Sequence, residues 1–371
     1  MWPGSNQFAL FISVAAICGL IAFSMSCHLP GHPNADYRGD VISQTGGWAD
    51  ESSCAECHNQ SDEFSKTGHA NTLRRAETPA SRALLSKLSE CEAALAEGTR
   101  VIDEGDQLIA ETSPDAVLHR LKLDWCFGSG MHATTWVSTL PDSHGNTDTL
   151  EYRWTWFTSL QGFAVTPGQP AQRGDSSVSV HGLLFDGSKA RRCFSCHSTV
   201  LPVSSGQIEE DGIHPGVTCQ RCHGPREEHV RSEGEIHPVG WTTSDRMESV
   251  RRCAVCHRLP EERPAADIRP DNPAIVRFQP MGLQQSACFL KSEMRCTTCH
   301  DPHRPMDAQD SAGIWQCLQC HNPEDDTHTL CGLGRNDDCL RCHMPAVQME
   351  FPVKFTDHWI RVLKQPAESL Q

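Results

Sequence analysis

Residues 216–225 read GVTCQRCHGP and contain the five-residue pattern C-x-x-C-H, from Cys219 to His223. The chain has 371 residues, of which 20 are Cys and 20 are His, so chance alone predicts about 0.06 copies of this pattern. Seven copies occur instead, and their final histidines are His58, His197, His223, His257, His300, His321 and His343. The repetition therefore reflects a required chemistry.

The spacing within each copy matches covalent haem attachment. Two thiols three residues apart on a helical turn can each add to a haem vinyl group, and the following His then points at the iron. The seven motifs predict seven c-type haems, with the seven histidines as proximal iron ligands. The attachment cysteines would be Cys54, Cys57, Cys193, Cys196, Cys219, Cys222, Cys253, Cys256, Cys296, Cys299, Cys317, Cys320, Cys339 and Cys342.

Other uses of paired cysteines fit this pattern poorly. Zinc ribbons need paired knuckles and do not require a His directly after each second Cys. Fourteen free thiols in an exported protein would exchange disulfides with one another, whereas haem attachment consumes the thiols. Haem is therefore the prediction.

Thirteen further histidines are available as distal iron ligands, and the chain leaves open which of them bind. A His only a few residues beyond a motif cannot reach the opposite face of its own haem, so His303, His229 and His69 should reach a different haem. His358 lies in the C-terminal tail, and its binding to a haem iron would order that tail. His132, His181 and His214 are secondary candidates, and Met ligation at some irons stays open.

The composition predicts an interior filled by the haems. Aromatic residues make up only 6% of the chain, and hydrophobic residues reach 38% only with all the Cys counted. Large apolar macrocycles packed against short helices would supply the missing core. The expected fold is mainly α with much irregular structure, built around a chain of haems.

The spacing of motifs and apolar residues suggests four regions. Residues 1–27 read as a signal peptide or as a membrane or lipid anchor, and residues 28–98 as a linker, the first motif and a helix over 81–97. Alternating apolar residues, with a hairpin turn at 103–106, predict a small β-rich insertion over 99–165. Residues 166–371 hold the other six motifs.

Four cysteines outside the motifs could form two disulfides in an oxidising compartment. We expect Cys288 to pair with Cys331 and Cys91 to pair with Cys126, although spacing alone cannot decide this.

The N-terminal apolar run predicts export to the periplasm or another extracytoplasmic compartment. Residues 8–26 are uncharged and long enough for a signal sequence or one spanning helix. Cys27 follows small residues, as in a lipoprotein cleavage site, without the usual Leu. Membrane association through residues 8–27 is therefore an expectation, and the type of anchor is left open.

The charge indicates the kind of partner. The formal net charge is −15 and is spread along the chain, which predicts a solvated anionic surface. Redox partner proteins with basic docking surfaces would suit it, and nothing suggests nucleic-acid binding.

Several local patterns resemble a superfamily of bacterial multihaem c-type cytochromes, which includes the tetrahaem cytochrome of ammonia oxidisers and the octahaem hydroxylamine oxidoreductases. The matching segments are 54–58 with 68–70, 216–225 with His229, 299–303, and 342–345 with 357–358. The resemblance implies a multihaem cytochrome c fold in which His69, His229, His303 and His358 are distal ligands. Residues 128–132 are similar to a segment of some members, which strengthens the case for His132 as a distal ligand.

Two departures separate this chain from the enzymes of that superfamily. No C-x-x-C-K motif occurs, and the only tyrosines are Tyr37 and Tyr152, so no Tyr beyond the last motif could cross-link a catalytic haem. No catalytic residue is therefore predicted.

The favoured function is electron transfer along mostly bis-His haems between exported partners. The alternative is an oxidoreductase acting on a small nitrogen or sulfur compound at one five-coordinate haem, so whether the chain is an enzyme stays open. A third hypothesis is a docking subunit that uses the β-rich insertion.

Overall fold

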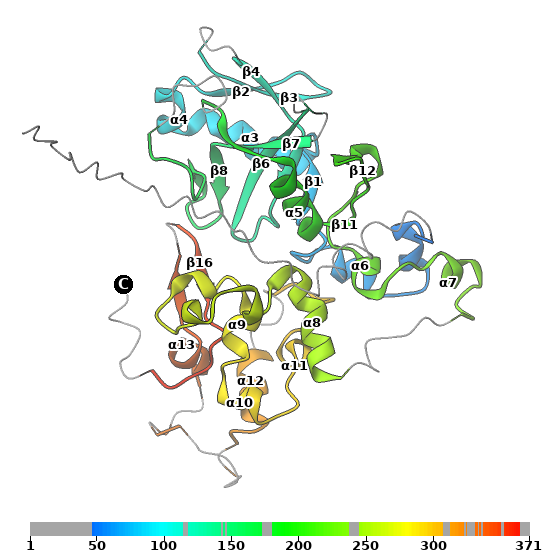
Figure 1. Ribbon diagram of the computed structural model, residues 1–371, viewed down its shortest axis with the longest axis vertical. Coiled ribbons are helices and arrows are strands. Elements are labelled where there is room, and N and C mark those ends of the chain that lie inside the picture. The colour runs from blue at the N-terminus through cyan, green and yellow to red at the C-terminus, as the bar shows by residue number, and fades with distance from the viewer. Residues whose placement is uncertain are drawn as a thin grey trace, which may run out of the picture.

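The structure, a computed structural model, has a sheet-rich lobe and a helical lobe (Figure 1). It describes residues 47–113, 118–141, 144, 147–172, 180–236, 245–306, 312–322, 324, 331–332, 334, 337–349 and 352–363. The predicted signal or anchor segment lies outside these residues. Within the described part, no helix is long and apolar enough to cross a membrane.

A seven-stranded antiparallel sheet forms the centre of the first lobe. Its strand order is β1-β5-β6-β7-β10, with β8 pairing to β6 and β9 pairing to β8. The strands are β1 (Leu73–Arg75), β5 (Trp125–Phe127), β6 (Ala133–Pro141), β7 (Thr147–Tyr152), β8 (Trp154–Phe157), β9 (Gly162–Val165) and β10 (Gly182–Phe185). Strands β1 and β10 lie outside residues 99–165, so the sheet recruits segments that flank the expected insertion.

A smaller sheet and three short helices pack on one side of this lobe. The sheet is β2 (Arg100–Asp103), β3 (Leu108–Glu111) and β4 (Arg120–Leu123), and β2 and β3 form a hairpin around residues 104–107. The helices are α3 (Pro79–Leu85), η2 (Ser86–Glu90) and α4 (Glu92–Ala96). The helix predicted over 81–97 is thus present as three shorter helices, because the chain tightens into the 3-10 helix η2 and the extended backbone of Cys91 (φ −85°, ψ 101°) interrupts it.

The two faces of the large sheet bury different aromatic residues. Trp136, Trp154 and Trp156 pack on the α3 side with the leucines of the small sheet. Trp125 and Phe127 point to the other side, where they pack against Phe194 of α5 (Gly187–His197). The lobe thus has a protein core of its own, and its second face carries a motif helix.

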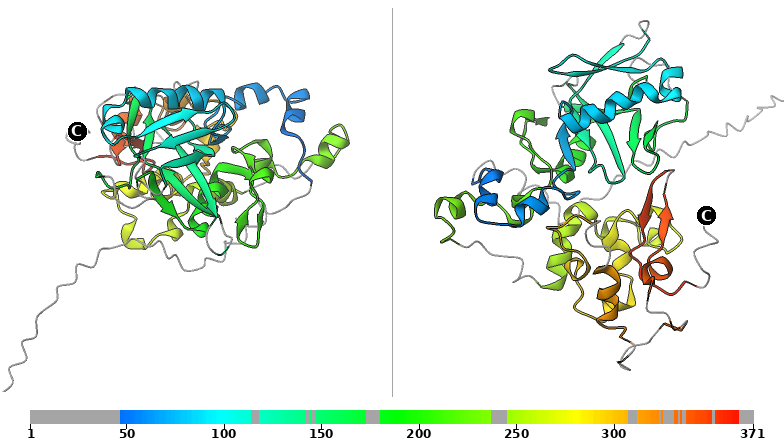
Figure 2. Two further views of the ribbon diagram at one scale, coloured as in Figure 1. Left: turned by 90° about the horizontal axis from the view of Figure 1, so that it is seen from above. Right: turned by 180° about the vertical axis from the view of Figure 1, so that it is seen from behind.

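The remaining elements hold the other motifs in short helices and turns (Figures 1 and 2). Near the sheet lobe lie η1 (Glu51–Glu56), α2 (Ser61–Phe64), β11 (Ser198–Val200), β12 (Val203–Ser204), β13 (Gln207–Ile208), η3 (Glu210–Gly212), β14 (His214–Pro215), α6 (Cys219–His223) and α7 (Glu227–Arg231). The helical lobe follows with α8 (Arg246–His257), η5 (Pro260–Glu262), η6 (Ala265–Asp267), η7 (Pro273–Ile275), α9 (Gln279–Leu283), α10 (Ala287–Leu290), α11 (Cys296–Cys299), α12 (Ala312–Leu318), α13 (Cys339–His343), β15 (Ala346–Gln348) and β16 (Lys354–Thr356).

Side chains alone give the helical lobe little core. Its hydrophobic cluster has three buried members among the described residues, Val250, Leu283 and Phe289. The described chain is thus a mixed helix-and-sheet fold with irregular connections, which is consistent with a cytochrome fold. The expectation of a mainly helical chain was too narrow, because backbone pairing extends the sheet beyond the insertion.

Candidate haem-binding cavity

One connected cavity of 4540 Å³ runs through the helical lobe and along the second face of the large sheet. An ordinary small-molecule site has about 300–1,000 Å³, so this space suits several large groups. All fourteen motif cysteines and all seven motif histidines line it, together with His69, His132, His229, His303 and His358. The residues predicted to hold haem thus share one interior.

Most motifs lie at the end of a short helix. Helices α5, α6, α8 and α13 each end on the motif His, and α11 ends one residue before His300. Gly224 after α6 and Arg258 after α8 have positive φ angles of 77° and 57°, which stop these helices. The two cysteines and the His of a motif therefore face the cavity from one helical turn.

Four motif histidines face a second imidazole at a nearly constant separation. The ring centroids are 6.3 Å apart for His58 and His229, 6.3 Å for His69 and His257, 6.1 Å for His223 and His303, and 6.1 Å for His300 and His358. Two metal–nitrogen bonds of about 2 Å, with roughly 1 Å more from each nitrogen to its ring centre, place centroids about 6 Å apart across one metal ion. The residues therefore fit bis-His haem iron.

Hydrogen bonds orient several of these rings. The Nδ1–H groups of His229, His358, His197 and His343 donate to the backbone carbonyls of Ile236, Thr356, Thr72 and Arg361, at 2.8–3.0 Å. The corresponding Nδ1–H of His257 donates to Oε1 of Gln279 at 2.7 Å. Fixing Nδ1 in this way leaves Nε2 as the free ligand atom, an arrangement typical of metal-binding histidines.

Burial keeps key imidazoles neutral. It lowers the pKa of His69 to about 4 and that of His358 to about 4. Burial also lowers the pKa values of His257 and His300. An imidazole must be unprotonated at its ligating nitrogen to bind iron, so these shifts favour ligation.

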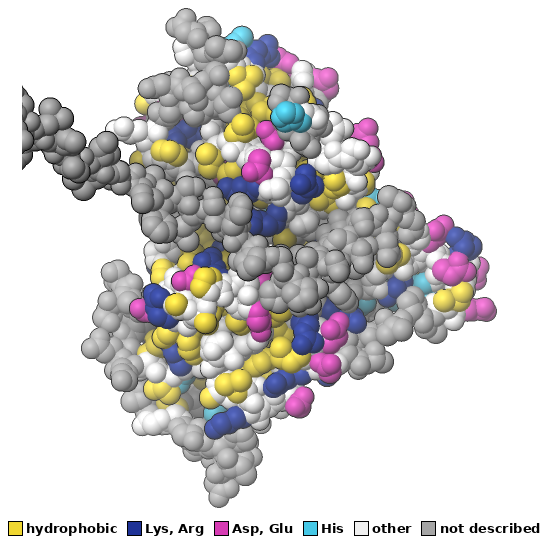
Figure 3. All heavy atoms as spheres, in the orientation of Figure 1, with side chains coloured by type: hydrophobic (Ala, Val, Ile, Leu, Met, Phe, Trp, Pro, Cys, Tyr) yellow, Lys and Arg dark blue, Asp and Glu magenta, His cyan; other side chains and the backbone are white. Residues whose placement is uncertain are grey.

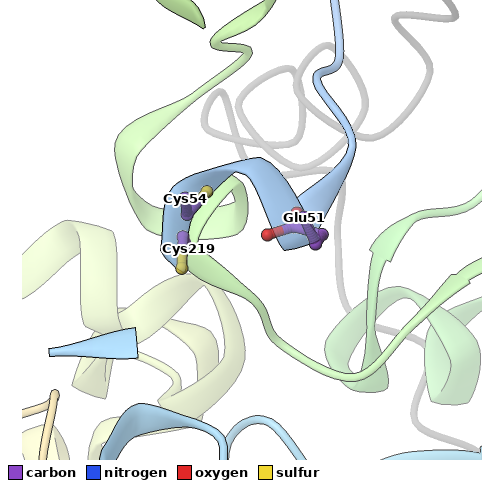
Figure 4. A group of neighbouring side chains, drawn as sticks. All are labelled: Glu51, Cys54 and Cys219. Carbon is purple, nitrogen blue, oxygen red and sulfur yellow. The ribbon is translucent and has the colours of Figure 1, made fainter. Parts of the chain in front are cut away.

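Thiols from different motifs also lie side by side. Cys54 and Cys219 lie close enough together for one thiol to affect the pKa of the other, as do Cys253 with Cys296 and Cys196 with Cys256. Figure 4 shows the first pair, on η1 and α6, with Glu51 beside it. The ligand atoms of Glu51, Cys54 and Cys219 lie within 4.8 Å of one another, close enough to hold a metal ion, but both thiols belong to C-x-x-C-H motifs.

Other predicted distal ligands are placed differently. His132 lines the cavity, and its ring packs 5.5 Å from that of Phe355. His181 is buried in the sheet lobe, with Nε2 2.7 Å from the Leu118 carbonyl, and His214 packs against Trp48. Neither His181 nor His214 lines the cavity, so the structure does not bring them to the motif histidines.

The expected disulfides are not formed. Cys91, Cys126, Cys288 and Cys331 are all free thiols. Cys126 is buried on β5 and accepts a hydrogen bond from Arg74 at 3.4 Å, whereas Cys91 lies 3.8 Å from the Phe163 carbonyl. The two sulfurs of the expected Cys91–Cys126 pair therefore have separate partners.

Sequence reasoning missed the polar wall that the large sheet contributes to the cavity. Thr135, Thr149, Glu151 and Thr155 line it beside the motif of α5. The Thr135 hydroxyl is buried there without a hydrogen-bond partner. The only available signal was the alternation of β7, where Thr149 and Glu151 share a face opposite Leu150 and Tyr152.

Comparisons with known proteins agree with haem attachment. The family described as "Cytochrome c554 and c-prime" matches residues 169–224, which contain two of the seven motifs. No curated protein matches. A solved structure, the outer cell wall cytochrome OcwA, is 15% identical over 57% of this chain and 37% of its own, with a TM-score of 0.36, which is too low to indicate a shared fold. The family match and the repeated motifs together support a multihaem c-type cytochrome with covalently bound haem.

Proposed function

We propose that this multihaem c-type cytochrome carries seven haems and transfers electrons between exported redox partners. The observation that carries the proposal is the set of four imidazole pairs at 6.1–6.3 Å, each joining a motif His to a His from another segment. When bound, haem iron with two such ligands accepts and releases single electrons.

The pairing supports cross-ligation between motifs. His229 follows the third motif but faces His58 of the first, and His303 follows the fifth but faces His223 of the third. His69 likewise faces His257 of the fourth motif, and His358 faces His300 of the fifth, so neither faces the motif nearest to it in the sequence. Each such ligand would tie two distant segments to one haem.

The thiol contacts support a continuous chain of haems. Because each motif thiol would carry a haem edge, the closeness of Cys54 to Cys219 favours a first haem beside the third. Cys196 with Cys256, and Cys253 with Cys296, would join the fourth haem to the second and the fifth. Cys317 is close enough to Cys299 and Cys339 to respond to their charges, which continues the order toward the last motif.

Surface charge bears on the partner. The face in Figure 3 has acidic and basic side chains interspersed, with Glu227 and Glu228 on the projecting helix α7. With a net charge of −15, the chain would attract basic docking surfaces through its overall field more than through one patch. An extracytoplasmic location follows from the same proposal, because the haems would be attached, and the redox partners contacted, after export.

A second candidate function is favoured at one haem. Within the described part of the chain, the ring contact of the motif residue His197 is with Phe127, 5.1 Å away, and not with a second imidazole. A haem attached there without a second protein ligand would offer one axial side to a small nitrogen or sulfur compound. The polar wall around Glu151 adjoins the same motif.

One experiment tests both functions. The protein is expressed with cytochrome c maturation, its haem is counted, and low-temperature electron paramagnetic resonance is recorded on the oxidised form. We expect seven haems, with low-spin signals from the four paired sites. His229→Ala should convert one low-spin haem to high-spin, because it removes the imidazole facing His58.

His214→Ala is the matched control, since His214 lies outside the cavity and should leave the spectrum unchanged. Fewer than four low-spin haems, or a wild-type spectrum for His229→Ala, would overturn the bis-His proposal. A high-spin haem in the wild type that binds cyanide or nitrite would favour the second function, whereas seven low-spin haems would remove its site.

A further inference from the structure

The polar wall contains a half-buried carboxyl group, that of Glu151, which is not one of the predicted haem ligands. Glu151 lies one residue before the end of β7, where its register partners are Val137 on β6 and Leu183 on β10. Gln169 Nε2 lies 3.4 Å from its Oε2 and donates to the Glu151 carbonyl at 3.0 Å. A carboxyl group at such a position must either be paired or be neutral.

The charged groups around Glu151 come from two packed segments. Lys189 lies on α5 and Arg277 lies between η7 and α9, and both favour the carboxylate. Burial outweighs them, and the net effect raises the pKa of Glu151. A change in one nearby charge would therefore change how readily this carboxyl group binds a proton.

Glu151 also lies close to one haem motif. It faces α5, where burial and, after it, the charge of Glu151 raise the pKa of the Cys193 thiol, which would carry a haem edge. Both residues line the cavity, as does Arg277, whose charge lowers the pKa of His197. A charge on the iron bound at His197 would therefore act on Glu151.

Solvent lies close to Glu151. Gln169, whose Nε2 lies 3.4 Å from the Glu151 Oε2, follows Pro167 and Gly168, which are exposed to solvent and also border the cavity. Glu151 is itself only half-buried, so a proton from solvent has a short distance to travel.

We propose that Glu151 is a proton-binding site coupled to the haem attached at Cys193 and Cys196. When that haem accepts one electron from a redox partner, one positive charge on iron is neutralised, and the Glu151 carboxylate takes up one proton from solvent. Oxidation reverses both transfers, so charge balances at each step. This inference rests on the proposed electron-transfer function.

The test measures proton uptake when the haem-loaded protein is reduced with a known amount of reductant in weakly buffered solution. Glu151→Gln keeps the shape of the side chain but cannot titrate, so uptake should fall by up to about one proton per chain. Glu151→Asp should restore uptake. Glu90→Gln, at an exposed position of η2, is the matched control and should not change it.

Infrared difference spectra between reduced and oxidised protein give a second readout. The wild type should show a protonated-carboxyl band that Glu151→Gln lacks. Equal proton uptake in wild type and Glu151→Gln, or a wild-type spectrum without such a band, would overturn the inference. Haem content and the number of electrons accepted separate this outcome from failure of the proposed function, in which the chain would take up few haems or few electrons.

Discussion

At the residue scale, Gly216 shows how the backbone itself positions two haem motifs. Its N–H donates to the His197 carbonyl at 3.0 Å, and the next residue, Val217, donates to the His69 carbonyl at 2.9 Å. The φ angle of Gly216 is +80°, and a Cβ atom there would lie 2.3 Å from the Ala70 carbonyl oxygen. Only glycine allows this close approach between the second motif, the third motif and the ligand segment at His69.

We therefore predict that Gly216→Ala destabilises the haem-loaded protein by about 2 kcal/mol or more, from backbone strain and the clash together. Thermal unfolding followed by circular dichroism measures this effect. Gly105→Ala is the matched control, because Gly105 has a φ of +92° but no atom within 4 Å of the added Cβ. Equal losses of stability in the two variants would show that the contact with Ala70 contributes nothing.

Sequence reasoning named the candidate attachment residues, which stay a prediction, but not the polar wall beside one of the motifs. The motif positions follow from local spacing, because a thiol pair and a His on one turn need no tertiary information. The reach argument also selected His69, His229 and His303, and the C-terminal tail suggested His358; the structure brings all four to motif histidines. Glu151 depends on a strand meeting a distant helix, which no local pattern encodes.

At the element scale, side-chain caps start the two longest motif helices. Asp186 accepts a hydrogen bond from the Lys189 N–H at 3.0 Å at the start of α5, and Asp245 accepts one from the Glu248 N–H at 2.8 Å at the start of α8. Each cap satisfies backbone donors that would otherwise lack a partner in the first turn. The caps thus set where each helix begins and so where its motif ends.

Asp186→Ala should lower the stability of the protein by about 1 kcal/mol at pH 7. The hydrogen bond from the Lys189 N–H lowers the pKa of the Asp186 carboxyl. A lowered pKa means that the carboxylate stabilises the fold above its unfolded pKa of about 3.9, and that this contribution disappears as the pH falls through the folded pKa.

Unfolding temperatures of wild type and variant at pH 7 and at low pH test this prediction. The difference between them should shrink at low pH. Asp186→Asn retains a good capping residue and should stay close to wild type at pH 7. A difference that is the same at both pH values would contradict the assigned role of the charge.

The boundaries of elements were harder to predict than their presence. The apolar spacing over 81–97 indicated a helix, but Cys91 adopts an extended backbone, so Ala94 is buried and Leu95 is half exposed. Strands β1 and β10 are each only three or four residues long, and they become strands because β5 and β7 offer them unpaired edges. Pairing of this kind is decided by the tertiary fold.

At the scale of the whole molecule, the two lobes differ in what fills them. Among the described residues, the main cluster of the sheet lobe has fourteen buried members, including Trp136 and Trp154, whereas that of the helical lobe has three. The cavity occupies the space that a core would fill in the helical lobe. So small a cluster contributes little against the conformational entropy lost by ordering the described residues between 246 and 363.

We therefore predict that the lobes respond differently to the absence of haem. When the chain is produced without cytochrome c maturation, residues 246–363 should lose protection against proteolysis and hydrogen exchange, while the strands from β2 to β9 keep much of theirs. Limited proteolysis with mass spectrometry compares the two forms directly, and the haem-loaded protein is the control. Because the second face of the large sheet borders the cavity, β7 should lose part of its protection against hydrogen exchange when haem is absent. Full protection of the helical lobe without haem would mean that protein contacts alone hold it, and the cavity would then need another explanation.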